Sequence, residues 1–269
     1  MQSWEDSDGR WHHKFRQSWL NTTDLCLERS RLEMDETMPK VDSDAACVGT
    51  AVHSAIEICL ASGGVPLSDM KELFNAEFSE LSALPTFRWV KYTDLSARAW
   101  GELCLTSWWT EILPTLSFDA QLEESFVVPL VDSNERVIEL SGTVDYVDRN
   151  KGLLIDWKTS GGGPYRAWEK QRWAVQPTVY TYAFTYKGVV PDFQYVVMHP
   201  KGVQRLDVVR TQGDHAWLAA KCVSMARLLE AGLSQWPLND NHALCSEKWC
   251  PAWASCKGAP RTISARITG

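Results

Sequence analysis

The sequence predicts an α/β fold in which helices flank a central β-sheet. Apolar residues recur at helical spacing through most of the first half of the chain, and alternating apolar and polar residues, typical of strands, begin after residue 120. A long helical pattern then returns before the C-terminal cysteines. With 269 residues, 45% of them hydrophobic, the chain can bury a core that suits one large domain with appendages, or one and a half domains.

The first half of the chain is predicted to be mainly helical. Residues 1–20 are interpreted as a polar N-terminal arm, followed by a helix over residues 22–34 that Asn21 would cap. The next helix, over residues 44–62, begins with a cap-like Asp-Ser-Asp sequence and stops at two glycines. Two further helices are expected over residues 69–84 and 93–110.

The strands are expected later in the chain. They are predicted over residues 124–130, 136–147, 152–158, 193–199 and 204–210. A glycine-rich loop and a helix over residues 165–186 separate the third strand from the fourth, and a last helix is expected over residues 213–233. The loop lacks the G-x-x-x-x-G-K-[ST] sequence of phosphate-binding loops, so no intrinsic ATPase or helicase activity is predicted.

Composition argues against several classes of protein. No apolar run approaches the length of a membrane span, and the polar N-terminus does not look like a signal peptide. The formal net charge of −7 argues against a non-specific nucleic-acid coat protein but permits a nuclease, which needs a basic lining only around its site. Most of the 14 tryptophans are expected to be packing residues, and some could stack on bases.

The most informative segment is Gly142-Thr-Val-Asp145, followed by Asp156-Trp-Lys158. A polar turn ending in Gly152 joins the two stretches, so a β-hairpin would bring Asp145 and Asp156 to the same end of a sheet. Lys158 lies two residues beyond Asp156 and would project from the same face. Two carboxylates that share a hard divalent cation beside an ammonium form a phosphodiester-cleaving centre. Taken alone, an ordinary hairpin with a surface Asp-x-Lys would be the favoured interpretation.

The eight cysteines fall into two groups. Without a secretion signal they do not indicate a disulfide framework. Four in apolar or helical surroundings are predicted to be buried thiols: Cys47, Cys59, Cys104 and Cys222. The other four could close a tetrahedral metal site that clips the C-terminus to the N-terminus: Cys26, Cys245, Cys250 and Cys256.

Four motifs in order resemble the RecB-like nucleases of the PD-(D/E)XK superfamily. They are Gly49-x-x-x-His53, Gly142-x-x-Asp145, Asp156-Trp-Lys158-Thr and Gln176-Pro-Thr-Val-Tyr180. The cysteine spacing is similar to that of the iron–sulfur subset, which includes the CRISPR-associated RecB-type exonucleases and the AddB-type helicase-nucleases. The resemblance spans about residues 22–257 and implies the restriction-endonuclease-like core, a mixed central β-sheet flanked by helices.

The resemblance also implies a role for each matching residue. His53, Asp145 and Asp156 would hold Mg²⁺ or Mn²⁺, helped by the backbone carbonyl of Trp157, and Lys158 would be the catalytic lysine. Gln176 and Tyr180, one helical turn apart, would position Lys158 or the scissile strand. The four cysteines Cys26, Cys245, Cys250 and Cys256 would bind a [4Fe–4S] cluster. The first gap in the C-terminal triplet holds four residues where the family often has two, which leaves zinc as the alternative.

The predicted nuclease domain therefore covers residues 21–257, with an arm before it and a tail over residues 258–269. Its parts are a helical region over residues 21–118, a catalytic sheet core over residues 119–235, and a cluster-binding loop over residues 240–257 that pairs with Cys26.

Several charged residues near the motifs have an ordinary interpretation beside a functional one. Glu57 shares a helix face with His53, yet a solvated helix charge is favoured over a role behind the metal ligands. A reach from Glu124 to the metal is the functional interpretation, and a polar strand end is the better one. Arg166, Lys170 and Arg172 could line a phosphate path, and a solvated helix start explains them equally well.

The sequence thus predicts a metal-dependent DNA exonuclease acting on single strands or duplex ends, with a structural iron–sulfur cluster. One alternative is a structure-specific or flap endonuclease of the same fold. Another is a non-catalytic DNA-binding protein or a partner in recombination or CRISPR adaptation, although a structural protein has no need of a buried charge cluster. The expected partners are DNA and, as a possibility, recombination or CRISPR-integration proteins, with no membrane. The expected location is the cytoplasm of a bacterium, or of the host if a phage encodes the protein.

Overall fold

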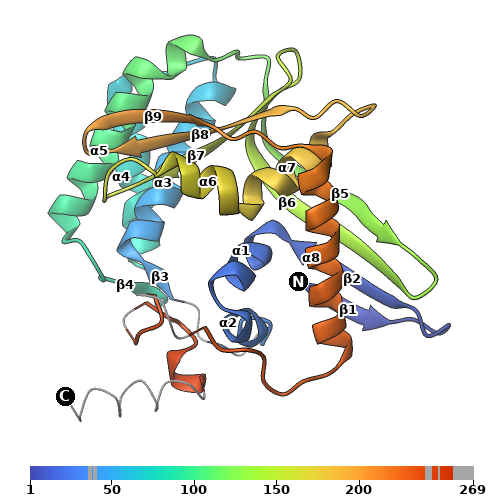
Figure 1. The fold of residues 1–269 in the computed structure, drawn as a ribbon. Coiled ribbons are helices and arrows are strands. Elements are labelled where there is room, and N and C mark those ends of the chain that lie inside the picture. The colour runs from blue at the N-terminus through green and yellow to red at the C-terminus, as the bar shows by residue number, and fades with distance from the viewer. Residues whose placement is uncertain (36–37, 39–40, 240–243, 248, 257–269) are drawn as a thin grey trace. The chain divides into compact units, whose positions relative to one another are not determined.

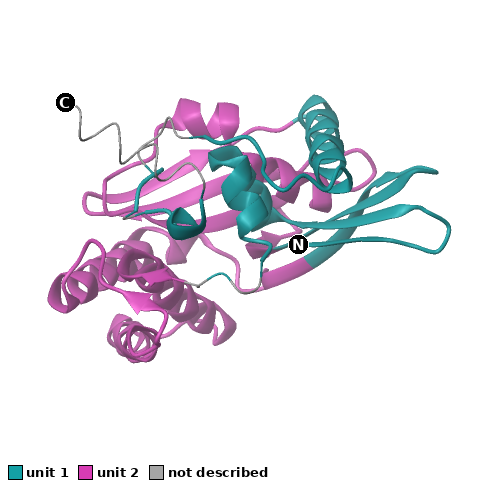
Figure 2. Cartoon of the chain, turned by 90° about the horizontal axis from the view of Figure 1, so that it is seen from below, with its two compact units in different colours: residues 1–40, 126–142, 211–269 teal, residues 41–125, 143–210 magenta. Residues whose placement is uncertain are grey.

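The computed structural model describes residues 1–35, 38, 41–239, 244–247 and 249–256. The chain forms two compact units, drawn in different colours in Figure 2. Unit 1 comprises Met1–Lys40, Phe126–Gly142 and Thr211–Gly269, and unit 2 comprises Val41–Ser125 and Thr143–Arg210. The predicted tail over residues 258–269, and parts of the predicted cluster-binding loop, lie outside the described residues.

Unit 1 contains strands where the sequence suggested an arm. β1 (Gln2–Glu5) pairs antiparallel with β2 (Trp11–Arg16), and β2 runs parallel to the first half of β6 (Arg136–Asp148). The prediction of a polar arm over residues 1–20 is therefore wrong. The alternation in β2 explains the difference, because His13 and Phe15 turn to the buried side while Lys14 between them points to the other face.

The helices of unit 1 are shorter than predicted. α1 (Gln17–Leu25) and α2 (Leu27–Leu32) replace the single helix expected over residues 22–34, and Asn21 lies inside α1 rather than at its cap. The break falls at Cys26, whose backbone is extended. α8 (Gln212–Glu230) is close to its predicted bounds, and a 3₁₀ helix, η2 (Trp253–Ser255), lies among the C-terminal cysteines.

The sheet of unit 2 is mixed. The second half of β6 pairs antiparallel with β7 (Leu153–Thr159), β7 runs parallel to β8 (Asp192–His199), and β8 pairs antiparallel with β9 (Gly202–Asp207). β5 (Gln121–Asp132) pairs with β6. Figure 1 shows β7, β8 and β9 with helices around them, and the predicted α/β class with a mixed sheet flanked by helices is confirmed.

The helices of unit 2 follow the predictions closely at its start. They are α3 (Asp44–Ala61), α4 (Leu67–Ser82) and α5 (Asp94–Glu111), with the 3₁₀ helix η1 (Leu113–Thr115) after α5. Ser43 caps α3 by accepting a hydrogen bond from the Ala46 N–H. Two short strands that the sequence did not indicate, β3 (Asp42–Ser43) and β4 (Phe87–Arg88), pair with each other.

α3 has the length and composition that could cross a membrane, but half of the helix is buried within the protein. A helix in the core of a protein meets the same test of length and composition, so this property is weak support for a membrane span.

The helix predicted over residues 165–186 is two helices, α6 (Ala167–Trp173) and α7 (Val175–Phe184). Ala174 between them is extended. Pro177 accounts for the break, because it has no N–H to bond the Trp173 carbonyl and its ring would collide with that turn. Proline is tolerated where it lies, in the first turn of α7.

The core of unit 2 determines which way the β7 side chains point. Ile155 and Trp157 pack into the core with the helices α3, α4 and α5, and Trp157 meets Trp108 edge to face with ring centroids 5.9 Å apart. Because side chains alternate along a strand, Asp156 and Lys158 face the other side of the sheet, toward α7. The four predicted buried thiols are confirmed: Cys47, Cys59, Cys104 and Cys222.

Candidate active site

The two predicted carboxylates lie side by side on neighbouring strands. The pairing of Tyr146 with Ile155 places Asp145 on β6 next to Asp156 on β7. The Asp145 Oδ2 accepts a hydrogen bond of 2.7 Å from the Trp157 N–H. Lys158 Nζ lies 2.5 Å from Asp156 Oδ2, an ion pair in which the carboxylate is buried. The hairpin thus brings all three predicted residues together within unit 2.

α3 brings His53 to the same centre. Its Nδ1 lies 3.6 Å from Asp145 Oδ2, and the backbone of Trp157 forms a hydrogen bond with the imidazole. Gly49, one turn earlier, allows this approach, because a Cβ there would lie 3.3 Å from Thr159 Oγ1. Burial and the nearby Lys158 charge lower the pKa of His53 from 6.5 to about 4. The imidazole is therefore neutral at pH 7, the form that binds metals.

Gln176 holds Asp156 from α7. Its Nε2 donates a hydrogen bond of 2.7 Å to Asp156 Oδ1 and one of 3.1 Å to Tyr180 Oη. The Tyr195 hydroxyl of β8 donates to Gln176 Oε1 at 3.2 Å. The contact of Gln176 is thus with the carboxylate, whereas the sequence suggested Lys158 or the scissile strand. Tyr195 was missed, because no local motif links β8 to this site.

The charges in this centre are not balanced by protein groups alone. Burial and the charge of Asp156 raise the pKa of Asp145 well above its ordinary value. Burial opposes the charge of Lys158, yet Asp156 and Asp145 raise the pKa of this lysine above its usual range. Asp156 Oδ2 is buried and its close contact is the ammonium of Lys158, so one ammonium faces two carboxylates. A divalent cation would offset the remaining negative charge.

A further carboxylate, Glu123 of β5, contributes to the electrostatics of the site. Burial and the charges of Glu57 and Asp156 raise its pKa. Its backbone is in the left-handed region, with φ of 46°, which is uncommon for a residue other than glycine. Sequence reasoning considered its neighbour Glu124, which instead pairs with Arg149. Glu57 is exposed on α3, in keeping with a solvated helix charge.

The donor chemistry of this centre fits a hard divalent ion. Carboxylate oxygens suit Mg²⁺ or Mn²⁺, and both the neighbouring pair of carboxylates that faces one ammonium and the raised pKa of Asp145 favour a cation there. Within the described residues, no three His, Cys, Asp or Glu side chains are already spaced as metal ligands. The structure therefore brings the predicted metal ligands close together, but their side chains are not yet in the positions that they would take around an ion.

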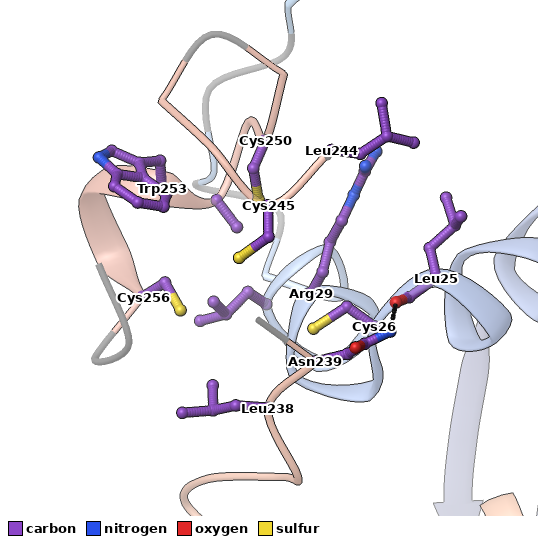
Figure 3. A pocket seen from close by; sticks show the side chains of 12 residues that line it. Leu25, Cys26, Arg29, Leu238, Asn239, Leu244, Cys245, Cys250, Trp253 and Cys256 are labelled. Carbon is purple, nitrogen blue, oxygen red and sulfur yellow. Dashed lines mark hydrogen bonds between the residues drawn. The ribbon is translucent and has the colours of Figure 1, made fainter. Parts of the chain in front are cut away.

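The four remaining cysteines gather in unit 1. Figure 3 shows their side chains around one pocket, Cys26 from the α1–α2 break and the others from the C-terminal segment: Cys245, Cys250 and Cys256. Burial, together with the charges of the neighbouring thiols, raises the pKa of Cys245. The pocket is otherwise lined mainly by apolar side chains, including Leu25 and Trp253. The Asn239 Nδ2 donates to the Leu25 carbonyl at 2.6 Å, tying the segment before the cysteine loop to α1.

The fold agrees with the family comparison. The chain belongs to the PD-(D/E)XK nuclease superfamily, which it matches over residues 17–257. Nucleases of this superfamily usually use Mg²⁺ or Mn²⁺. Among solved structures, the chain is similar to the crystal structure of SSO0001, with 17% identity and a TM-score of 0.41 over 88% of this chain and 96% of that one. No curated protein matches the chain.

Proposed function

We propose that this protein is a divalent-metal-dependent deoxyribonuclease that removes nucleotides from single strands or duplex ends. The observation that carries the proposal is the partly buried cluster of Asp145, Asp156 and Lys158, in which two neighbouring carboxylates face one ammonium. Burying charges costs stability, which favours a functional role for this cluster, and superfamily membership indicates a nuclease.

In this proposal His53, Asp145, Asp156 and the Trp157 carbonyl hold Mg²⁺ or Mn²⁺. When bound, such an ion polarises a phosphodiester and lowers the pKa of a water. The protein groups have distinct tasks. The Trp157 N–H orients Asp145, and Gln176 orients Asp156 with support from Tyr180 and Tyr195. The ammonium of Lys158 offsets the negative charge that develops on the phosphate oxygens in the transition state.

The decisive measurement is cleavage of end-labelled linear single-stranded DNA with Mn²⁺, comparing wild type with Lys158→Ala. The expected result is stepwise shortening by wild type and none by the variant. A closed circular single strand of the same length should resist the enzyme, because an exonuclease needs an end. Cleavage of the circle would favour the endonuclease alternative, and an inactive wild type on every DNA would refute the nuclease proposal.

We further propose that the four thiols in unit 1 bind a [4Fe–4S] cluster. Four cysteines that line one mostly apolar pocket support this, because thiolates are the ligands of iron–sulfur clusters and of structural zinc. Burial, together with the charges of neighbouring thiolates, raises the pKa of Cys245 and of Cys250. The proposed role is structural, because the pocket joins the α1–α2 break to the C-terminal segment within unit 1.

A further inference from the structure

α6 buries none of its side chains, although it carries two tryptophans. A surface helix normally turns an apolar stripe to the core. In α6 the largest apolar groups face outward instead, with Trp168 54% exposed and Trp173 57% exposed. The two indoles meet edge to face, with ring centroids 5.0 Å apart. Packing in unit 2 therefore does not explain why this helix has two tryptophans.

Polar contacts anchor α6. The buried guanidinium of Arg210 donates hydrogen bonds to three carbonyls at its C-terminal end, those of Lys170, Gln171 and Ala174. The Gln171 side chain donates to the Val209 carbonyl at 3.0 Å and accepts from the Val209 N–H at 3.1 Å. Because these bonds hold the helix by its backbone and by Gln171, the indoles are left available for another molecule.

The same helix reaches the candidate active site through Lys170. Its Nζ lies 4.3 Å from the ring centroid of Tyr165 and 5.7 Å from that of Tyr195. Lys158 Nζ lies 5.9 Å from the same Tyr195 ring. Two ammonium groups thus approach one aromatic ring, one from the proposed catalytic centre and one from α6. Arg166 and Arg172 add two more cations to the helix region.

We propose that α6 binds the unpaired strand of a DNA substrate, with Trp168 and Trp173 stacking on bases and Lys170 contacting a backbone phosphate beside the scissile one. This inference rests on the proposed nuclease function and names its substrate class, single-stranded DNA. The faces of bases are free to stack on indoles only where the strand is unpaired. Cations beside the indoles attract the phosphates of the same strand.

Binding can be measured without cleavage. The full-length protein, in buffer without added divalent metal, is titrated into a fluorescently labelled oligothymidylate, and anisotropy gives the Kd. The Trp168→Ala/Trp173→Ala variant should bind about tenfold or more weakly for each base that loses its stacking partner. The double Phe variant should regain most of the affinity, because a phenyl ring still stacks. Tyr186→Ala is the matched control, since its ring is 70% exposed in unit 2 and lies outside α6; its affinity should equal that of wild type.

A blunt-ended duplex of the same length tests the substrate class. The double Ala variant should bind this duplex as wild type does. An unchanged Kd for oligothymidylate, or an equal loss on single strand and duplex, would overturn the role of α6. Neither result would affect the nuclease proposal, which depends on cleavage by wild type and its loss in Lys158→Ala. Circular dichroism of each variant excludes loss of fold as the cause of weaker binding.

Discussion

The amide of Trp157 donates its hydrogen to Asp145, so the residue between Asp156 and Lys158 also orients the first carboxylate. Trp157, which follows Asp156 in β7, therefore fixes the position of Asp145 relative to Asp156. The Trp157 ring is buried in the core of unit 2. The geometry of the site depends in this way on the packing of the sheet, because a shift of Trp157 would move the amide that Asp145 accepts from.

The two carboxylates should respond differently to substitution. Asp145→Asn should reduce cleavage by about a hundredfold or more. In metal-free buffer near pH 7 its melting temperature should equal or exceed that of wild type, since the raised pKa of Asp145 means that its charge destabilises the folded state. The destabilisation builds up as the pH rises from the ordinary pKa of an aspartate, 3.8, to the raised pKa of the folded state, so the gain should largely disappear near pH 4. Thermal melts at both pH values test this.

Asp156→Asn should abolish cleavage and also lower stability. It removes the partner 2.5 Å from Lys158 Nζ, and a partly buried ammonium would remain unpaired. Loss of one member of a buried pair costs up to about 3–5 kcal/mol, and the 29% exposure of the lysine side chain places the expected loss at the lower end. Asp119→Asn, at an exposed position, is the control. Normal cleavage by either active-site variant would end the nuclease assignment.

Lys158→Ala should keep metal affinity and lose the chemical step. An ammonium cannot ligate a cation, so its removal affects charge development in the transition state rather than binding of the ion. The expected loss in kcat is about a hundredfold or more, and Mn²⁺ affinity from calorimetry should change little. A parallel fall of metal affinity and rate would assign Lys158 to holding the site together.

His53 should make stability depend on pH between about 6.5 and 4. Its pKa is lowered in the folded protein, so the unfolded chain takes up a proton on this imidazole before the folded protein does. Its contribution is therefore complete above pH 6.5 and decreases as the pH falls toward 4. Urea unfolding of metal-free wild type and His53→Ala at pH 7.5 and 4.5 gives the difference. The pKa of His13 is also lowered by burial, but His13 is present in both proteins, so its effect cancels in the difference between their free energies of unfolding. An equal difference at both pH values would contradict the lowered pKa.

Local patterns in the sequence predicted the parts of the site that lie within short segments. The hairpin of β6 and β7 and the helix α3 each carry their residues at fixed spacing, so His53, Asp145, Asp156 and Lys158 could be named. The prediction of an N-terminal arm was wrong because each residue of β2 pairs with a residue of β6 about 125 positions further along the chain. Tyr195 and Glu123 depend on pairing across the sheet and on an unusual backbone conformation, which no short motif encodes. The break at Ala174, by contrast, could have been predicted from Pro177.

The last prediction concerns the four thiols around the pocket of unit 1. Protein purified without oxygen should be brown, with broad absorbance in the visible region, if they bind a [4Fe–4S] cluster. Cys250→Ser should bleach it, because Cys250 lines the pocket. Cys59→Ala, which changes a thiol in the core of unit 2, should leave the colour unchanged.

The same variants test two separate proposals, that the metal is an iron–sulfur cluster and that it cross-links Cys26 to the C-terminal cysteines. A metal joining Cys26 to the C-terminal cysteines closes a loop of more than two hundred residues, which by analogy with a long disulfide loop removes unfolded-chain entropy worth on the order of 4–5 kcal/mol. Cys250→Ser should therefore lower the free energy of unfolding clearly, while the cleavage rate of the folded protein changes less. Colourless protein that contains one tightly bound zinc would refute the iron–sulfur cluster but support a metal cross-link between Cys26 and the C-terminal cysteines. Colourless, metal-free protein with unchanged stability in Cys250→Ser would refute both, since the thiols would then line the pocket without joining its sides.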